Sequence, residues 1–129
     1  MFNKFLVDTD VLVDFLRGEE KAVDFVKRDS KKILISAITA AELYAAVREN
    51  GERRELDEFV EIFAVLPVTP GIAVKGGLFK RDFFKSFRIG LADAIIAATA
   101  EIHEADLKTL NSKHFPMFKG LKPPYKKGG

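Results

Sequence analysis

The chain has 129 residues, of which 47% are hydrophobic and 31% are charged, and its formal net charge is +2. This length suits one compact domain, and the apolar share excludes an intrinsically disordered chain. Because no cysteine is present, disulfides, thiolate zinc sites and cysteine nucleophiles are excluded, and we expect a cytoplasmic protein.

Strand and helix signals alternate along the first half of the chain. Residues 4–7 form a short apolar run that ends at Asp8, which predicts a strand followed by a turn. Helical spacing runs over 11–16, up to a glycine that suits a helix end, and again over 19–28. The β-branched run at 33–35 predicts the second strand.

The middle of the chain continues this alternation. A helix is expected over 39–48, with the threonine at its start as N-cap, and another over 56–63. Residues 64–68 are a strand candidate. The Thr-Pro pair at 69–70 then predicts a helix start, and we expect the glycine pair at 76–77 to interrupt or loosen that helix.

The last elements complete the predicted fold. Residues 91–103 are apolar on almost every side, which predicts a central helix packed on both faces, and 107–110 predict a late strand. Strands separated by helices imply parallel pairing and right-handed crossovers. The fold class is therefore α/β, a three-layer α/β/α sandwich around a central parallel sheet of four to five short strands.

Secretion, membrane insertion and further domains are not expected. Charged residues interrupt both the amino-terminal segment and the most apolar stretch, so we expect neither a signal peptide nor a membrane span. We expect a single domain over 1–125 and a disordered tail over 126–129.

Charge is distributed unevenly. Residues 1–74 carry 10 basic and 14 acidic side chains, a net of −4, whereas residues 75–129 carry 11 and 5, a net of +6. An acidic first half suits cation ligands. The basic residues of the second half suit either a polyanion-binding surface or an ordinary solvated helix face, and the sequence leaves both open.

Three carboxylates fall where an open parallel sheet gathers its ligands. Asp8 follows the first strand, where it either serves a site or caps the next helix. Glu42 stands among small and apolar residues that should bury much of its helix, but it also completes a capping box with Thr39. Asp93 has no cation within a turn, so it needs either a site or, as an N-cap, backbone amides.

Together these acids suit a hard divalent cation, because carboxylates and water are the ligands that magnesium prefers. Such a site polarises a phosphodiester and lowers the pKa of a bound water for in-line attack, without a serine, cysteine or histidine nucleophile. Asp10 and Asp14 are weaker candidates for the site, because helical spacing carries them toward solvent.

Four segments carry a resemblance to a known family. They are FLVDTDVLVD at 5–14, ISAITAAEL at 35–43, LADAIIAATA at 91–100 and LKTLNSKHF at 107–115. In order and spacing they resemble the PIN domain and, within it, the VapC toxins of toxin–antitoxin pairs. The resemblance implies a PIN-like fold and an endoribonuclease that hydrolyses RNA phosphodiester bonds.

The resemblance also implies roles for individual residues. Asp8, Glu42 and Asp93 would form a catalytic triad that binds Mg²⁺ or Mn²⁺. Relatives often place a fourth acid shortly after the last strand. The matching residue here is Asn111, a neutral oxygen ligand, with Thr109 as its supporting neighbour. We therefore expect one well-held cation and a second that is weaker or depends on substrate.

Other residues near these positions keep two interpretations. Thr9 is expected to support the site or to cap the following helix. His114 falls where relatives carry an acid, and it suits either a phosphate contact or an ordinary surface histidine.

The resemblance further implies a homodimer and a VapB-type antitoxin whose extended or helical tail covers the site. A stripe of phenylalanines at helical spacing, interleaved with basic residues, suits either an interface, base stacking on RNA, or ordinary core. The stripe comprises Phe79, Phe83, Phe84 and Phe87, with Lys80, Arg81, Lys85 and Arg88 between them.

Two alternatives remain from the sequence. Asp8-Thr9-Asp10 resembles the Asp-x-Asp opening of haloacid-dehalogenase-like phosphatases, in which Asp8 would be the nucleophile and Asp10 the acid/base. The other alternative is a PIN domain that binds RNA or an antitoxin without cutting, because Asn111 replaces the expected acid.

Overall fold

The structure, a computed structural model, describes residues 4–87 and 89–126, except for the side chains of 84–87. The strands are β1 (Phe5–Val7), β2 (Ile33–Ser36), β3 (Ala64–Leu66) and β4 (Asp106–Lys108). The helices are α1 (Thr9–Leu16), α2 (Glu20–Arg28), α3 (Ala37–Ala46), α4 (Glu52–Ile62), α5 (Pro70–Phe87) and α6 (Leu91–Ile102), with short 3₁₀ turns η1 (Ser30–Lys32) and η2 (Ser112–His114).

The four strands form one parallel sheet in the order β3-β2-β1-β4, which confirms the predicted parallel α/β fold. The chain moves from β1 outward to β2 and β3, and then returns to the other side of β1 with β4. The strand order therefore reverses between β1 and β4. In open parallel sheets, ligands bind at the carboxyl ends of the strands beside such a reversal.

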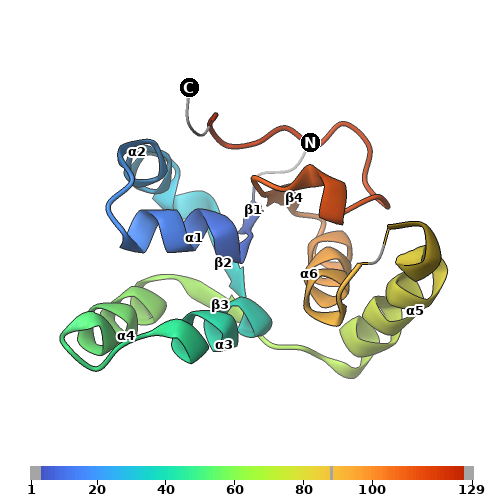
Figure 1. Cartoon of the computed structure of the whole chain (residues 1–129), viewed down its shortest axis with the longest axis horizontal. Coiled ribbons are helices and arrows are strands. Elements are labelled where there is room, and N and C mark those ends of the chain that lie inside the picture. The colour runs from blue at the N-terminus through green and yellow to red at the C-terminus, as the bar shows by residue number, and fades with distance from the viewer. Residues whose placement is uncertain (1–3, 88, 127–129) are drawn as a thin grey trace.

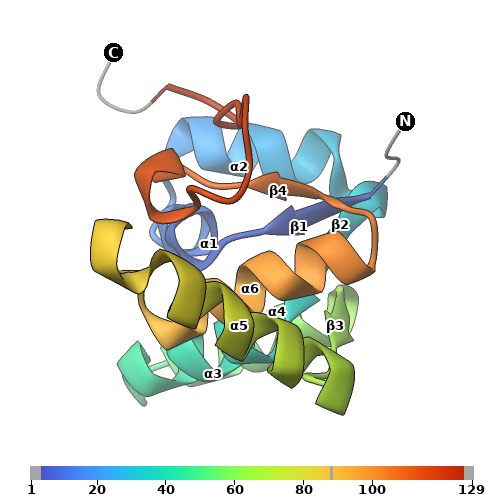
Figure 2. The same ribbon diagram turned by 90° about the vertical axis from the view of Figure 1, so that its right-hand side faces the viewer.

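Helices cover both faces of the sheet, as Figures 1 and 2 show. On one face, α1 to α4 pack on β1 and β2 around buried Val7, Leu12, Ile35 and Phe59. On the other face, α6 packs on Leu6 and Leu107, and a partly buried residue of α5 and segment 115–121 join this second core. The three-layer prediction is confirmed, and burial is deepest on β1 and β2, whereas two of the three residues of β3 are exposed.

The prediction of a helix broken at the glycine pair 76–77 is wrong, because α5 runs without interruption from Pro70 to Phe87. Gly76 is buried at the crossing with α6. A Cβ atom there would lie 3.1 Å from the Ile95 Cα and 3.4 Å from the Ala94 carbonyl oxygen. Gly76 therefore allows close packing of the two helices, whereas Gly77 faces open space.

The prediction that Asp14 faces solvent is also wrong. Asp14 is 6% exposed, and its Oδ2 accepts a hydrogen bond of 2.9 Å from the Tyr125 hydroxyl. The Lys21 ammonium group donates to the Lys126 carbonyl oxygen at 2.8 Å. The carboxyl-terminal segment thus crosses back onto α1 and α2. The predicted disorder of 126–129 otherwise falls on residues 127–129, which lie outside the described residues.

The phenylalanine stripe is only partly described. Phe79 packs against the second core, and its ring centroid lies 6.3 Å from that of Phe83. The core interpretation therefore fits Phe79. The side chains of Phe84, Phe87, Lys85 and Arg88 lie outside those described, so their roles stay predictions. No helix in the described part of the chain is long and apolar enough to cross a membrane.

Candidate active site

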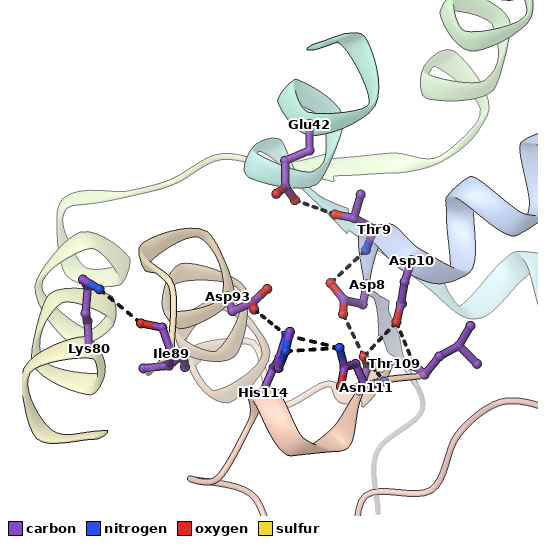
Figure 3. A network of polar contacts seen from close by, with 11 residues as sticks. Asp8, Thr9, Asp10, Glu42, Lys80, Ile89, Asp93, Thr109, Asn111 and His114 are labelled. Carbon is purple, nitrogen blue, oxygen red and sulfur yellow. Dashed lines mark hydrogen bonds and ion pairs between the residues drawn. The ribbon is translucent and has the colours of Figure 1, made fainter. Parts of the chain in front are cut away.

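Polar side chains gather where the ends of β1 and β4 meet the amino-terminal halves of α3 and α6 (Figure 3). Figure 3 shows the carboxylates of Asp8, Glu42 and Asp93 turned toward the same space, with Thr109 and His114 beside them. This is the edge of the sheet where the strand order reverses. The fold thus brings the three predicted acids to one place from three distant parts of the sequence.

Asp8 both caps a helix and faces the site. Its Oδ1 accepts from the Thr9 amide at 2.8 Å, which makes it the N-cap of α1. Its Oδ2 accepts from the Thr109 hydroxyl at 2.7 Å, and its own amide donates to the Lys108 carbonyl oxygen at 2.9 Å. The two interpretations of Asp8 are therefore compatible, since Oδ1 caps α1 and Oδ2 lies on the side of the site.

The Asp8 carboxyl group is difficult to ionise. Its pKa is raised to about 7, chiefly by burial and then by the charges of Asp10 and Asp93, against the hydrogen bonds from Thr109 and Thr9. Burial disfavours the charged form because the protein interior solvates an ion poorly. A cation near Asp8 would favour ionisation, so the residue suits a metal ligand.

Asp10 does not point to solvent, contrary to the prediction. Its Oδ1 accepts from the Val11 amide at 2.8 Å, and its Oδ2 accepts from the Leu110 amide at 3.1 Å and lies 3.5 Å from the Thr109 hydroxyl. Burial raises the Asp10 pKa, these hydrogen bonds lower it, and the charge of Asp14 raises it. Asp10 thus ties the start of α1 to the segment after β4.

Glu42 is not part of a capping box. The N-cap of α3 is Ser36, whose Oγ accepts from the Ile38 amide at 3.1 Å, because β2 continues into α3 without a loop. Glu42 therefore lies in the second turn, beyond reach of the unpaired amides at the helix start. Its Oε1 accepts from the Thr9 hydroxyl at 2.6 Å, and the Thr9 and Thr39 hydroxyl oxygens are 3.1 Å apart.

The expected burial of α3 is only partly correct. Thr39 and Leu43 are buried, whereas Glu42 itself is exposed at the edge of the site. The Glu42 side chain is therefore positioned by its hydrogen bond with Thr9 rather than by packing. This contact is compatible with the supporting role expected of Thr9, which stays a prediction.

Asp93 is not an N-cap either, since Gly90 holds that position and Asp93 lies in the first turn of α6. Its Oδ2 lies 3.1 Å from the His114 Nδ1, and the His114 ring lies 3.2–3.3 Å from the Asn111 Nδ2. Burial raises the Asp93 pKa, His114 lowers it, and the charge of Glu42 raises it. The sequence did not reveal His114 as the partner of Asp93.

Asn111 and Thr109 lie where the sequence predicted them, on the segment after β4. The Thr109 hydroxyl oxygen accepts from the Asn111 amide at 3.0 Å, while the hydroxyl hydrogen goes to Asp8. Thr109 is 2% exposed, so its position is fixed. This threonine joins Asp8 to the fourth position of the site.

The acids influence one another, but they do not yet surround a common point. Asp93 raises the pKa of Asp8, and Glu42 raises that of Asp93. Within the described ranges, no three carboxylate or imidazole groups are spaced to hold one ion. A cation held by all three acids would therefore require their side chains to move from the positions described.

The donor set nevertheless fits a divalent cation. Among the described residues, no lysine or arginine forms an ion pair with Asp8, Asp10, Glu42 or Asp93. Uncompensated carboxylates in a partly buried cluster are costly. Three carboxylates and one amide oxygen match the ligands of magnesium and manganese.

Comparison with known proteins agrees with this geometry. The family described as PIN domain matches residues 5–117. The chain belongs to the PIN-domain family. Ribonuclease VapC10 of Mycobacterium tuberculosis is 44% identical over 123 residues, which cover 93% of this PIN domain and 92% of the relative. Ribonuclease VapC19 of the same organism is 41% identical and is covered to 98%.

Solved structures also resemble this PIN domain in fold. A toxin–antitoxin complex from Klebsiella pneumoniae contains a chain with a TM-score of 0.82 and 26% identity, over 95% of this chain and 99% of that one. A DNA-bound VapBC from Salmonella typhimurium has a TM-score of 0.76 at 23% identity, over 95% and 97% of the two chains. The latter similarity concerns the fold alone.

Proposed function

We propose that this PIN domain is a magnesium- or manganese-dependent endoribonuclease and the toxin of a VapBC-type pair. The observation that carries the proposal is the convergence of Asp8, Glu42 and Asp93 at the strand-order reversal, without a lysine or arginine counter-ion among the described residues. The names of the relatives, ribonuclease VapC10 and VapC19, support RNA as the substrate.

In the proposed mechanism, Asp8, Asp93 and Glu42 would hold the principal cation. Such a cation would supply polarisation of the phosphodiester and a lowered pKa for a water molecule that attacks in line. The Thr109 hydroxyl donates to the Asp8 carboxylate, and the Thr9 hydroxyl donates to the Glu42 carboxylate. These two hydrogen bonds orient the carboxylates before substrate binds. Asn111 offers a neutral ligand for a second, weaker cation.

The phosphatase alternative loses support at Asp10. An acid/base residue needs a carboxyl oxygen that can reach the substrate. Both Asp10 oxygens instead accept backbone hydrogen bonds, from Val11 and Leu110. We therefore do not propose a haloacid-dehalogenase-like reaction.

The proposal is tested with purified, partner-free protein, a structured RNA pool and Mn²⁺. We expect cleavage that disappears with excess EDTA and in Asp93→Asn, while the exposed Asp24→Asn on α2 cleaves like the wild type. Equal cleavage by Asp93→Asn would remove the site from consideration. Absence of cleavage by the folded wild type would favour a non-cleaving, RNA-binding PIN domain.

We further propose a VapB-type antitoxin partner and a homodimer. The Klebsiella structure, described as a toxin–antitoxin complex, supports the first part of this proposal. Co-expression with a small adjacent gene product, followed by chromatography with light scattering, tests both parts. We expect a complex with two copies of this chain and suppressed cleavage. A monomer that does not bind the co-expressed protein would contradict the proposal.

A further inference from the structure

Asp10 occupies an unusual place beside the site. It belongs to the first turn of α1, yet its Oδ2 accepts from the amide of Leu110, 100 residues later. Leu110 stands between Thr109, which binds Asp8, and Asn111. Asp10 therefore acts as a latch, by which we mean that its hydrogen bond to the Leu110 amide holds the segment that carries Asn111.

Among the described residues, hydrogen bonds from Leu110, Val11 and Thr109 stabilise the negative charge of Asp10. None of the lysine or arginine side chains that the structure describes forms an ion pair with it. Both of its oxygens accept from backbone amides, which hold the carboxylate against the start of α1 and the segment after β4. Its charge lies close to the site, because the Thr109 hydroxyl oxygen is 3.5 Å from the Asp10 Oδ2 and donates to the Asp8 Oδ2 at 2.7 Å.

A through-space charge matters at this position because Asn111 is neutral. The family resemblance led us to expect an acid at this position. Residues 109–114, which follow β4, contain no carboxylate. Asp10 lies behind the same segment, where its Oδ2 approaches the Thr109 hydroxyl that holds Asp8. A negative charge behind the first ligands favours a divalent cation in front of them.

We propose that Asp10 supplies from behind the site the negative charge that Asn111 does not, and thereby strengthens divalent-cation binding without coordinating the ion. This inference rests on the proposed function, because it assumes that Asp8 is a ligand. Asp10 is thus a positioning and charge-supplying residue, not a catalytic one. A latch without an electrostatic role is the alternative.

The experiment measures Mn²⁺ binding calorimetrically, on the partner-free protein without RNA at one fixed pH. Asp10→Asn keeps the size of the side chain and removes its charge. We expect its Mn²⁺ affinity to fall about tenfold, within the range for residues behind metal ligands. Asp10→Ser, which keeps a small acceptor at the start of α1, is the second variant should Asp10→Asn fail to fold.

Asn111→Asp separates charge from latching. If Asp10 acts by charge, Asn111→Asp increases the affinity of the wild type and restores that of Asp10→Asn, because the segment stays in place. If Asp10 acts only as a latch, the gain from Asn111→Asp disappears in the Asp10→Asn background, since the segment has moved. That second result overturns the inference, as does unchanged affinity in Asp10→Asn.

Asp8→Asn distinguishes failure of the inference from failure of the proposed function. Loss of Mn²⁺ binding in Asp8→Asn, together with wild-type binding in Asp10→Asn, overturns only the role of Asp10. Wild-type binding in Asp8→Asn overturns the cation site itself and the inference with it.

Discussion

Asp8→Asn is expected to abolish RNA cleavage and to make the metal-free protein more stable at pH 8. The loss of activity should be about 10³-fold, which corresponds to the several kcal/mol of charge stabilisation that a bound cation supplies. The gain in stability follows from burial, because the folded protein must otherwise hold the Asp8 charge close to Asp10 and Asp93. Asparagine keeps one oxygen for Thr109 and carries no charge.

The same carboxyl group sets a pH dependence with a definite sign. Its pKa is about 7 in the folded protein and 3.8 without the fold, so the unfolded chain loses its proton first as pH rises. The contribution of Asp8 to the free energy of unfolding therefore falls between about pH 4 and pH 7 and is constant above that range. Asp8→Asn removes this decline.

Thermal unfolding in EDTA at pH 4.5, 6 and 8, read by circular dichroism, measures both effects. Asp24→Asn, which changes an exposed carboxylate on α2, serves as the matched control and should follow the wild type. An Asp8→Asn protein that is less stable than the wild type at pH 8 would refute the burial argument. Retained cleavage in that variant would refute the ligand role.

Gly76→Ala is expected to destabilise the protein by about 1–3 kcal/mol, the usual cost of overpacking a core. The new methyl group would lie 3.0–3.1 Å from the Cγ1 and Cα atoms of Ile95, and the backbone cannot yield without moving α5 from α6. Because α6 carries Asp93, we also expect weaker Mn²⁺ binding. Urea denaturation measures the first effect and calorimetry the second.

Gly77→Ala is the matched control for this substitution. The two glycines are neighbours in α5, but a methyl group at Gly77 meets nothing within 4 Å. An alanine there should stabilise the helix by up to about 1 kcal/mol, since glycine is the poorer helix former. If both variants gained stability, the close crossing at Gly76 would not exist.

The fold was predictable because its signals are local. Short apolar runs separated by helical spacing give the strand and helix order, and the rules for crossovers then give a parallel sheet. The start of α3 was mispredicted because Thr39 looks like a cap in sequence. Only the structure reveals that β2 passes into α3 at Ser36, which removes Thr39 from that role.

The predicted acids also came together, but their partners were not predictable. The contacts of Asp93 with His114 and of Asp10 with Leu110 join segments far apart in the chain, and no spacing rule reports them. The glycine pair at 76–77 was misjudged for a related reason. Glycine weakens an isolated helix, yet the crossing with α6 requires a residue without a side chain.

The order of the strands has a consequence for synthesis of the protein. Asp8 precedes Thr109, which holds it, by 101 residues, and Asn111 and His114 follow Thr109 in the chain. Until β4 joins β1, the nascent chain has the acids of α3 and α6 but no finished site, and β1 remains an open edge of the sheet. A chain interrupted before β4 therefore has neither Thr109 to hold Asp8 nor Asn111 at the fourth position, so the site is completed only once β4 and the segment after it are present.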